Sequence, residues 1–180
     1  ELHHYLVYYQ SIISWNMRLL DKEPVKRVEK FLKDFDQSLK VIVLENSART
    51  AQDAATALGC ELGAIVKSLL FKTEDSFILC LVAGDKRCSL TKLKKIKNRK
   101  DIFMASPDEV KTQTGYTIGG VSPVGHLSKL EIFIDKSLDR FINIFAAAGH
   151  PNCVFKINFI NIKKITNGKN EDITEWESQN

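Results

Sequence analysis

The chain has 180 residues, of which 44% are apolar and 27% are charged, with a formal net charge of +4 and an isoelectric point near 8.8. This composition is ordinary for a soluble globular protein and predicts one domain with a sizeable core. The mild basic excess is compatible with a polyanionic partner but does not by itself establish one.

The first 16 residues, ELHHYLVYYQSIISWN, are apolar and aromatic and contain no Lys or Arg. A secretory signal would begin with basic residues and continue as an unbroken apolar run, which Gln10, Ser11 and Ser14 interrupt here. The stretch is also too short to span a bilayer. We therefore expect residues 1–16 to be an added or upstream extension, with Met17 as the natural start. Residues 17–180 are expected to form a single domain in a cytoplasmic protein that does not contact a membrane.

Short helices and strands are predicted along the first half of the chain. In order, they are a helix at 24–37, a strand at 41–45, a helix at 50–59, a helical turn at 61–66 and strands at 68–73 and 76–83. Thr50 and Asp53 form a capping-box pattern at the start of the second helix, and Gly59 is placed to end it. A tight turn at Glu74 and Asp75 would join the two strands into a hairpin.

The second half continues in the same way. The predicted elements are a basic helix from Ser89, a strand at 101–105, a helix from 106 to 115, strands at 130–135, 142–148 and 153–157, and a last helix from 158 to 168. Ser106, Pro107 and Glu109 make a strong helix start. Because strands and short helices mix without β-α-β alternation, we predict an α+β domain. Its β-sheet is expected to be mixed and curled, barrel-like, and surrounded by short helices.

The segment TGYTIGGVSPVGH, residues 114–126, holds four of the nine glycines. It lacks the Lys-Ser/Thr ending of a phosphate-binding P-loop and the order G-x-G-x-x-G. Glycines permit positive φ and the close approach of a ligand, and Pro123 stiffens the turn. Fixed backbone N–H groups could then stabilise an oxyanion. From composition alone, a structural turn between a helix and a strand is the stronger alternative.

Three polar residues stand out against apolar surroundings. Lys67, within AIVKSLLF, either points into a cavity or faces solvent at a helix–strand junction, with equal weight on each. Asp135 ends a predicted strand, where a carboxylate usually caps a turn. His150 follows three alanines and a glycine; it could line the space that these small residues leave, or be an ordinary turn residue.

Nothing in the sequence indicates covalent or metal-dependent catalysis. No G-x-S-x-G elbow is present, and no Cys–His pair can be argued from spacing. The four cysteines form no C-x-x-C pair, so we expect no metal and no cofactor, and isolated cysteines suggest a reducing compartment. An enzyme of this kind would work by positioning and polarising its substrate.

Four motifs, taken in order, resemble the YbaK/EbsC/ProX family of aminoacyl-tRNA editing domains. They are VKSLLF, IGGVSPVGH with its G-x-x-x-P loop, IFID, and AAAGHPN followed by CVFKI. The resemblance covers about residues 25–176. It implies hydrolysis of the ester that links a wrong amino acid to its tRNA, by a domain that is either free-standing or inserted in a prolyl-tRNA synthetase.

The resemblance also implies roles for individual residues. Lys67 matches the signature lysine, which contacts the terminal adenosine or the aminoacyl group, and Gly119, Gly120 and Ser122 lie in the loop that holds the substrate carbonyl. The remaining substrate-binding positions are expected to be Val121, Pro123, Asp135, Gly149 and His150. A synthetase rejects a smaller or isosteric amino acid only about 10–200-fold, which makes a second hydrolytic site useful.

The segment from Lys86 to Lys100 has eight basic residues and no acidic one. We expect part of it to lie along tRNA phosphates, although an ordinary solvated helix face is the alternative for several of its lysines. The tRNA-binding candidates are Lys92, Lys94, Lys95, Lys97 and Arg99.

Together these expectations describe a trans-acting deacylase for tRNA mischarged with a small amino acid such as Ala, Ser or Thr. A prolyl-tRNA or another aminoacyl-tRNA synthetase is a possible partner. The alternatives are a Cys-tRNA(Pro) deacylase, against which the GHPN sequence argues, and a non-catalytic module that binds tRNA or a synthetase.

Overall fold

A five-stranded mixed sheet forms the centre of the molecule. The computed structural model describes residues 2–45 and 48–177, so residues 1, 46–47 and 178–180 lie outside the described part. In spatial order the sheet contains β5 (Phe103–Met104), β2 (Val66–Lys72), β3 (Phe77–Ala83), β6 (Glu131–Asp135) and β9 (Lys169–Glu171). The β2–β3 hairpin is antiparallel, whereas β6 runs parallel to both β3 and β9. The predicted hairpin is therefore confirmed.

Two smaller sheets flank the central one. The first is antiparallel and contains β1 (Val41–Val43), β8 (Cys153–Ile157) and β7 (Ile144–His150); the second pairs β10 (Thr174–Trp176) with β4 (Lys86–Cys88). Among the described residues, a single isolated bridge, Ile65 with Phe145, joins the three-stranded sheet to the segment that enters β2. The predicted curled, barrel-like sheet is thus wrong, because the strands separate into three sheets with interrupted hydrogen bonding.

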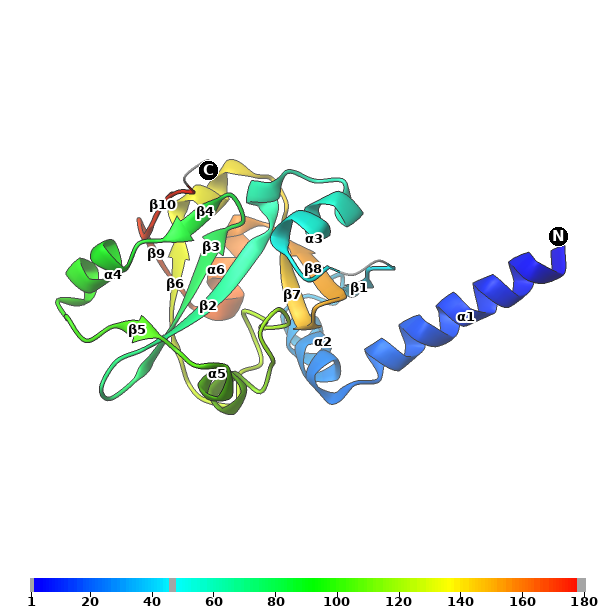
Figure 1. Cartoon of the computed structure of the whole chain (residues 1–180), viewed down its shortest axis with the longest axis horizontal. Coiled ribbons are helices and arrows are strands. Elements are labelled where there is room, and N and C mark those ends of the chain that lie inside the picture. Colours follow the sequence, from blue (N-terminus) through cyan, green and yellow to red (C-terminus); the bar gives the residue numbers. More distant parts are fainter. Residues whose placement is uncertain (1, 46–47, 178–180) are drawn as a thin grey trace.

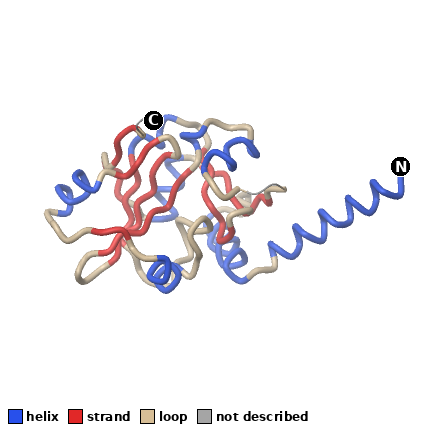
Figure 2. The backbone as a smooth tube through the Cα atoms, in the orientation of Figure 1, coloured by secondary structure: helices blue, strands red, loops and turns tan. Residues whose placement is uncertain are grey.

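Short helices surround these sheets (Figure 2). They are α2 (Glu23–Phe35), α3 (Ala51–Leu58), α4 (Leu90–Lys97), α5 (Pro107–Thr114) and α6 (Phe159–Thr166), with 3₁₀ turns η1 (Leu62–Ala64) and η2 (Lys136–Arg140). Local sequence signals set several of their ends. Thr50 caps α3 with a capping box completed by Asp53, and Ser106 caps α5 in the same way with Glu109.

Both faces of the central strand β3 are buried. Leu79 and Leu81 face a core shared with α2 and the three-stranded sheet, while Ile78, Cys80 and Val82 face a second core beneath α4. The sequence of a strand that is covered on both faces is a continuous apolar run rather than an alternation of apolar and polar residues. This rigid centre supports the loops and strand ends that form the pocket described below.

The N-terminal helix α1 (Leu2–Leu20) projects away from the rest of the molecule (Figure 1). It runs without interruption through Met17, and Leu19 is its one buried residue. Within the described residues, no helix is long and apolar enough to cross a membrane. The expectation that residues 1–16 lie outside the domain stays a prediction.

Candidate functional site

One pocket is lined by three of the residues that the sequence motifs single out, Lys67, Gly119 and Val121. Its volume is about 230 Å³, and its walls come from the start of α3, from β2, from the glycine-rich loop and from the β7–β8 hairpin. The polar residues of the lining are Arg49, Thr50, Lys67 and Ser68. The others are Ala48, Ala51, Ala54, Ile65, Val66, Leu69, Ile118, Gly119, Val121, Phe145, Ala147, Pro151 and Val154. Sites for drug-sized ligands measure roughly 300–1,000 Å³, so this pocket suits a smaller group.

Lys67 lies on β2, opposite Val82 of β3, and its side chain is 24% exposed. Its ammonium donates hydrogen bonds to the carbonyl of Lys86 and, at 3.0 Å, to Oε1 of Glu177. The lysine and the glycine-rich loop therefore line the same hollow, as the sequence motifs predicted. The two acceptors at the ammonium were not predicted.

The glycine-rich loop is held by a buried tyrosine. The side chain of Tyr116 is fully buried, and its hydroxyl donates to the carbonyls of Val124 at 2.7 Å and Gly125 at 3.0 Å. Arg27 of α2 lies 4.8 Å from the ring centroid and also donates to the Gly125 carbonyl. Burial raises the pKa of Tyr116 to about 12, so the phenol stays neutral at physiological pH. These contacts fix both ends of the loop against the core.

Two residues at the tip of the loop line the pocket and have backbone amides without a hydrogen-bond partner in the described part of the chain. Gly119 adopts φ +91°, a left-handed conformation that other residues avoid, and it lines the pocket together with Val121. Their amide groups have no hydrogen-bond acceptor among the described residues. The amide of Gly120, by contrast, donates to the carbonyl of Thr117 at 2.9 Å and closes a turn. Gly119 and Val121 are thus the candidate oxyanion donors, whereas the sequence predicted contacts from Gly119, Gly120 and Ser122.

Two other loop residues have structural positions outside the lining. Ser122 is fully buried, and its hydroxyl accepts a hydrogen bond from the Val124 amide at 3.3 Å. The Ser122 carbonyl lies 2.6 Å from Nε2 of His126, a ring whose pKa is lowered by burial. Pro123 is buried as well. Neither residue is among the described residues that line the pocket, and the expected contact of Ser122 with the substrate stays a prediction.

The Gly149–His150 segment packs against Gly120 of the glycine-rich loop. A Cβ atom at Gly120 would lie 3.0 Å from Cα of His150, and one at Gly149 would lie 2.7 Å from the backbone of Pro24. Nδ1 of His150 accepts a hydrogen bond from the Asn152 amide at 3.1 Å. Burial and the charge of Lys22 lower the pKa of His150. Pro151, rather than His150 or Gly149, reaches the pocket lining.

Asp135 lies away from the pocket and holds the C-terminal segment. Its carboxylate is 1% exposed and accepts hydrogen bonds from the backbone and hydroxyl of Ser137, from the Ile173 amide and from the Thr174 hydroxyl. A buried carboxylate needs such donors. Asp135 is observed as a strand-end cap and is not among the described residues that line the pocket, so its expected role in shaping the substrate pocket stays a prediction.

Sequence analysis missed several pocket residues, and Ser68 is the most informative. Its Oγ is buried and finds no hydrogen-bond partner within the described residues. A buried hydroxyl without a partner costs free energy, so one that lines a pocket is available to a ligand. Its position next to Lys67 was the available signal. Arg49 and Thr50 also line the pocket, although Thr50 was singled out only as a helix cap.

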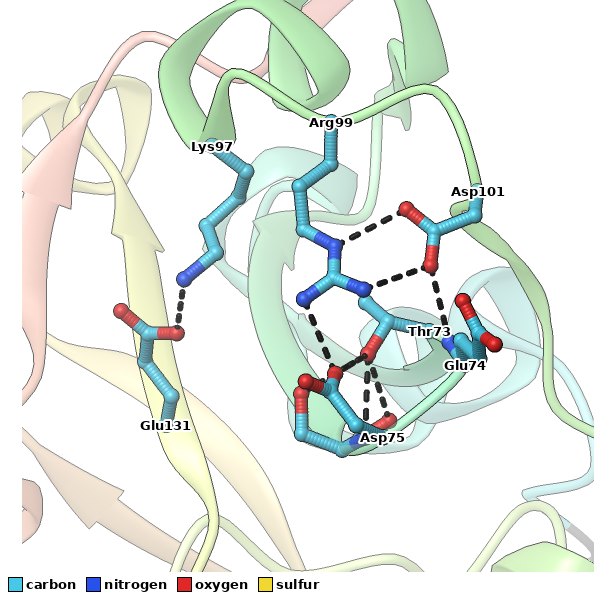
Figure 3. Close-up of polar contacts among 8 residues, drawn as sticks. Thr73, Glu74, Asp75, Lys97, Arg99, Asp101 and Glu131 are labelled. Carbon is cyan, nitrogen blue, oxygen red and sulfur yellow. Dashed lines mark hydrogen bonds and ion pairs between the residues drawn. The ribbon is translucent and has the colours of Figure 1, made fainter.

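The basic helix α4 uses many of its charges internally. Lys97 pairs with Glu131 at 2.5 Å, and Arg99 binds Asp101 and Asp75, which joins the segment after α4 to the β2–β3 turn (Figure 3). The Arg99 hydrogen bonds hold the pKa of Asp101 well below its usual range. Lys92 pairs with Asp172 at 2.9 Å.

Lys94 and Lys95 differ from these three residues, because neither forms an ion pair with another described residue. Lys94 lies instead over the ring of Phe103, at 5.6 Å from its centroid. Of the five residues expected to bind tRNA, Lys94 and Lys95 are therefore the two whose charges are not already used within the fold.

Comparison with known proteins identifies the family of this chain. The family model described as "Aminoacyl-tRNA editing domain" matches residues 45–164. The chain therefore belongs to the aminoacyl-tRNA editing domain family.

Two individual relatives illustrate how much of the chain is matched. The chain is 36% identical over 134 residues to the uncharacterized protein YwhH of Bacillus subtilis, covering 74% of this chain and 85% of that protein. It is 31% identical over 131 residues to a proline–tRNA ligase of Thermosipho melanesiensis, covering 73% of this chain and 23% of the ligase.

Among solved structures, the chain resembles a crystal structure described as "a putative trans-editing enzyme for prolyl tRNA synthetase". The TM-score is 0.81 at 36% identity, covering 86% of this chain and 98% of that chain. A structure of the hypothetical protein APE2540 matches with a TM-score of 0.77 at 25% identity, covering 83% of this chain and 99% of that one. These matches support an α+β editing-domain fold.

Proposed function

We propose that this protein is a trans-acting deacylase that hydrolyses mischarged aminoacyl-tRNA. The observation that carries the proposal is the pocket itself, which is lined by Lys67 together with Gly119 and Val121, whose amides have no acceptor among the described residues. Within the described part of the chain, no Cys, His, Asp or Glu lines the pocket. The chemistry that suits such a site is positioning and electrostatic stabilisation of an ester that is already reactive.

In the proposed reaction, a water molecule adds to the ester carbonyl carbon while the amides of Gly119 and Val121 donate to the developing oxyanion. The bond from this carbon to the ribose oxygen then breaks. The ribose oxygen takes the proton that the water loses, so the products are the free amino acid and tRNA with its terminal hydroxyl restored. Lys67 orients the substrate at the rim, and the hydroxyl of Ser68 supplies a further polar contact.

The size of the pocket favours a small amino acid. Four of its lining residues are alanines, Ala48, Ala51, Ala54 and Ala147, and its volume is about 230 Å³. Apolar walls of this kind accept Ala, Ser or Thr side chains more readily than large ones. A hydrophobic pocket discriminates weakly against an added hydroxyl, so activity on more than one of these amino acids is expected.

The proposed partner is mischarged tRNA, and a prolyl-tRNA synthetase is the proposed source of it. This inference is supported by the likeness to proline–tRNA ligases and to a protein described as a trans-editing enzyme for such a synthetase. Phosphate contacts from Lys94 and Lys95 would add affinity without reading sequence.

A panel of mischarged tRNAs tests the proposal. The purified protein is incubated with tRNA(Pro) carrying Ala, Ser, Thr, Cys or Pro, and loss of the labelled amino acid is followed with time. We expect hydrolysis of at least one of the Ala, Ser and Thr esters, with Pro-tRNA spared. Hydrolysis confined to the Cys ester would replace the proposed substrate class. Binding without turnover of any ester would contradict catalysis.

A further inference from the structure

The C-terminal strap, defined here as residues 169–177, reaches back to the pocket lysine. Its strand β10 pairs antiparallel with β4, with Trp176 opposite Lys86 (Figure 1). The residue after this strand, Glu177, places Oε1 3.0 Å from Nζ of Lys67. The family model matches residues 45–164, so the strap lies outside the matched region. A residue remote in sequence therefore contacts the cation of the pocket.

Several contacts fix the strap at this position. The ammonium of Lys86 lies 4.0 Å from the centroid of the Trp176 ring, a cation–π contact, and Glu175 pairs with Arg87 at 2.9 Å. Upstream, the buried carboxylate of Asp135 accepts hydrogen bonds from Ile173 and Thr174. These contacts hold β10 in place, and the end of β10 positions the carboxylate of Glu177 beside Lys67.

The second acceptor of Lys67 comes from the strand that pairs with the strap. An ammonium has three N–H donors. The carbonyl of Lys86 takes one and Glu177 takes another, which leaves one donor for a ligand in the pocket. A lysine side chain loses considerable conformational entropy when it is fixed in one rotamer. Because the Lys86 carbonyl and Glu177 already fix Lys67 in the free protein, this entropy is lost before the substrate binds.

We propose that Glu177 is a positioning residue for the deacylation site, acting through Lys67. It holds the ammonium at the pocket rim with one donor directed to the substrate. It also compensates the charge of Lys67 before an ester enters. The proposal rests on the proposed function for its catalytic consequence, but the contact between Glu177 and Lys67 can be tested independently of turnover.

The first test measures how readily the amine of Lys67 is acylated, and it does not depend on turnover. The whole protein is labelled with a trace of an amine-acylating reagent, and mass spectrometry compares modification of Lys67 with that of Lys156, an exposed lysine on β8. In the Glu177→Gln variant we expect Lys67 labelling to rise at least threefold relative to Lys156, because the ammonium loses its charged acceptor. The matched control is Glu175→Gln, which removes a strap carboxylate that pairs with Arg87 instead. Unchanged labelling in Glu177→Gln, or an equal rise in both variants, would overturn the proposal.

The second test reads catalysis. Glu177→Gln is expected to lower kcat/KM for the mischarged tRNA about fivefold, whereas Glu175→Gln stays within twofold of the original protein. Glu177→Asp keeps the carboxylate and is expected to recover most of the loss, which a merely structural role would not require. Original kinetics in Glu177→Gln would contradict the positioning role. If the unaltered protein hydrolyses no ester, the proposed function fails, and the labelling comparison still decides whether Glu177 holds Lys67.

Discussion

Gly120 packs directly against the backbone of His150. A Cβ atom at position 120 would come within 3.0 Å of both N and Cα of His150 and within 3.1 Å of the Gly149 carbonyl carbon. Contacts this close leave no room for a side chain unless one of the two segments moves. The contact links two of the four motifs that suggested the family, IGGVSPVGH and AAAGHPN, since the backbone of the second packs against the loop formed by the first.

Gly120→Ala is therefore expected to displace the donor loop and to lower deacylation at least tenfold, because small errors in the position of catalytic groups are costly. Gly59→Ala is the matched control. It places a Cβ in open space at φ +65°, which costs about 1 kcal/mol of stability but lies at the end of α3 away from the donor loop. Rates and thermal unfolding are measured for both variants. Equal rates in Gly120→Ala and the unaltered protein would show that the loop is not the catalytic element.

Ser68→Ala tests whether the unpartnered hydroxyl serves the substrate. Removing a buried polar atom that has no partner should leave the free energy of unfolding unchanged or slightly higher. At the same time, we expect KM for the mischarged tRNA to rise severalfold. Ser137→Ala provides the contrast, since Ser137 donates to buried Asp135 and should contribute to stability without affecting KM. A normal KM in Ser68→Ala would remove Ser68 from the site.

Lys94 and Lys95 offer a test of the tRNA surface. In the double variant Lys94→Ala with Lys95→Ala, we expect weaker tRNA binding and a slope of log Kd against log salt that is smaller by about 1–2, as for the loss of two phosphate contacts. Lys97→Ala should instead lower the melting temperature, because Lys97 pairs with partly buried Glu131. Fluorescence titrations at several salt concentrations measure the slope. An unchanged slope would place the tRNA elsewhere.

Tyr116 predicts a specific pH dependence of stability. Its folded-state pKa is about 12, whereas an unfolded tyrosine titrates near pH 10, so the unfolded state ionises first as the pH rises. The stability associated with the neutral phenol is fully present below about pH 10. This contribution to stability is lost between about pH 10 and pH 12, and the loss is roughly 2–3 kcal/mol for a difference of two pKa units.

Urea unfolding at pH 8 to 12 measures this loss, with Tyr116→Phe as the reference because it lacks the titrating group. At pH 8 we expect the variant to be less stable by about 1–2 kcal/mol, since the hydrogen bonds to Val124 and Gly125 are absent. The difference should shrink above pH 10 and reverse as the pH approaches 12, because the unaltered protein then loses roughly 2–3 kcal/mol that the variant does not lose. Parallel pH profiles for the two proteins would contradict the raised pKa.

Local chemistry made much of the fold predictable. The capping boxes at Thr50 and Ser106 and the apolar runs on either side of Glu74 and Asp75 depend on neighbouring residues alone, and the structure confirms each of them. The division into three sheets was not predictable in this way. It depends on β4 pairing with β10 from the far end of the chain, and short strands of three residues carry little periodic signal.

The candidate site shows the same contrast between features set by neighbouring residues and features set by distant ones. Lys67, Gly119 and Val121 were found because their motifs are continuous in sequence and line one pocket. The contacts that tie Asp135 to Thr174 and Arg99 to Asp75 were not predicted, because these partners lie 39 and 24 residues away along the chain. A charge in a sequence has no visible partner, so a structural ion pair looks the same as a free binding residue.

The most direct test of the central claim is a comparison of deacylation rates for the unaltered protein and Lys67→Ala on the preferred mischarged tRNA. We expect the variant to retain its melting temperature and circular dichroism spectrum but to lose nearly all ester hydrolysis. A folded Lys67→Ala protein that hydrolyses the ester at the original rate would contradict this expectation.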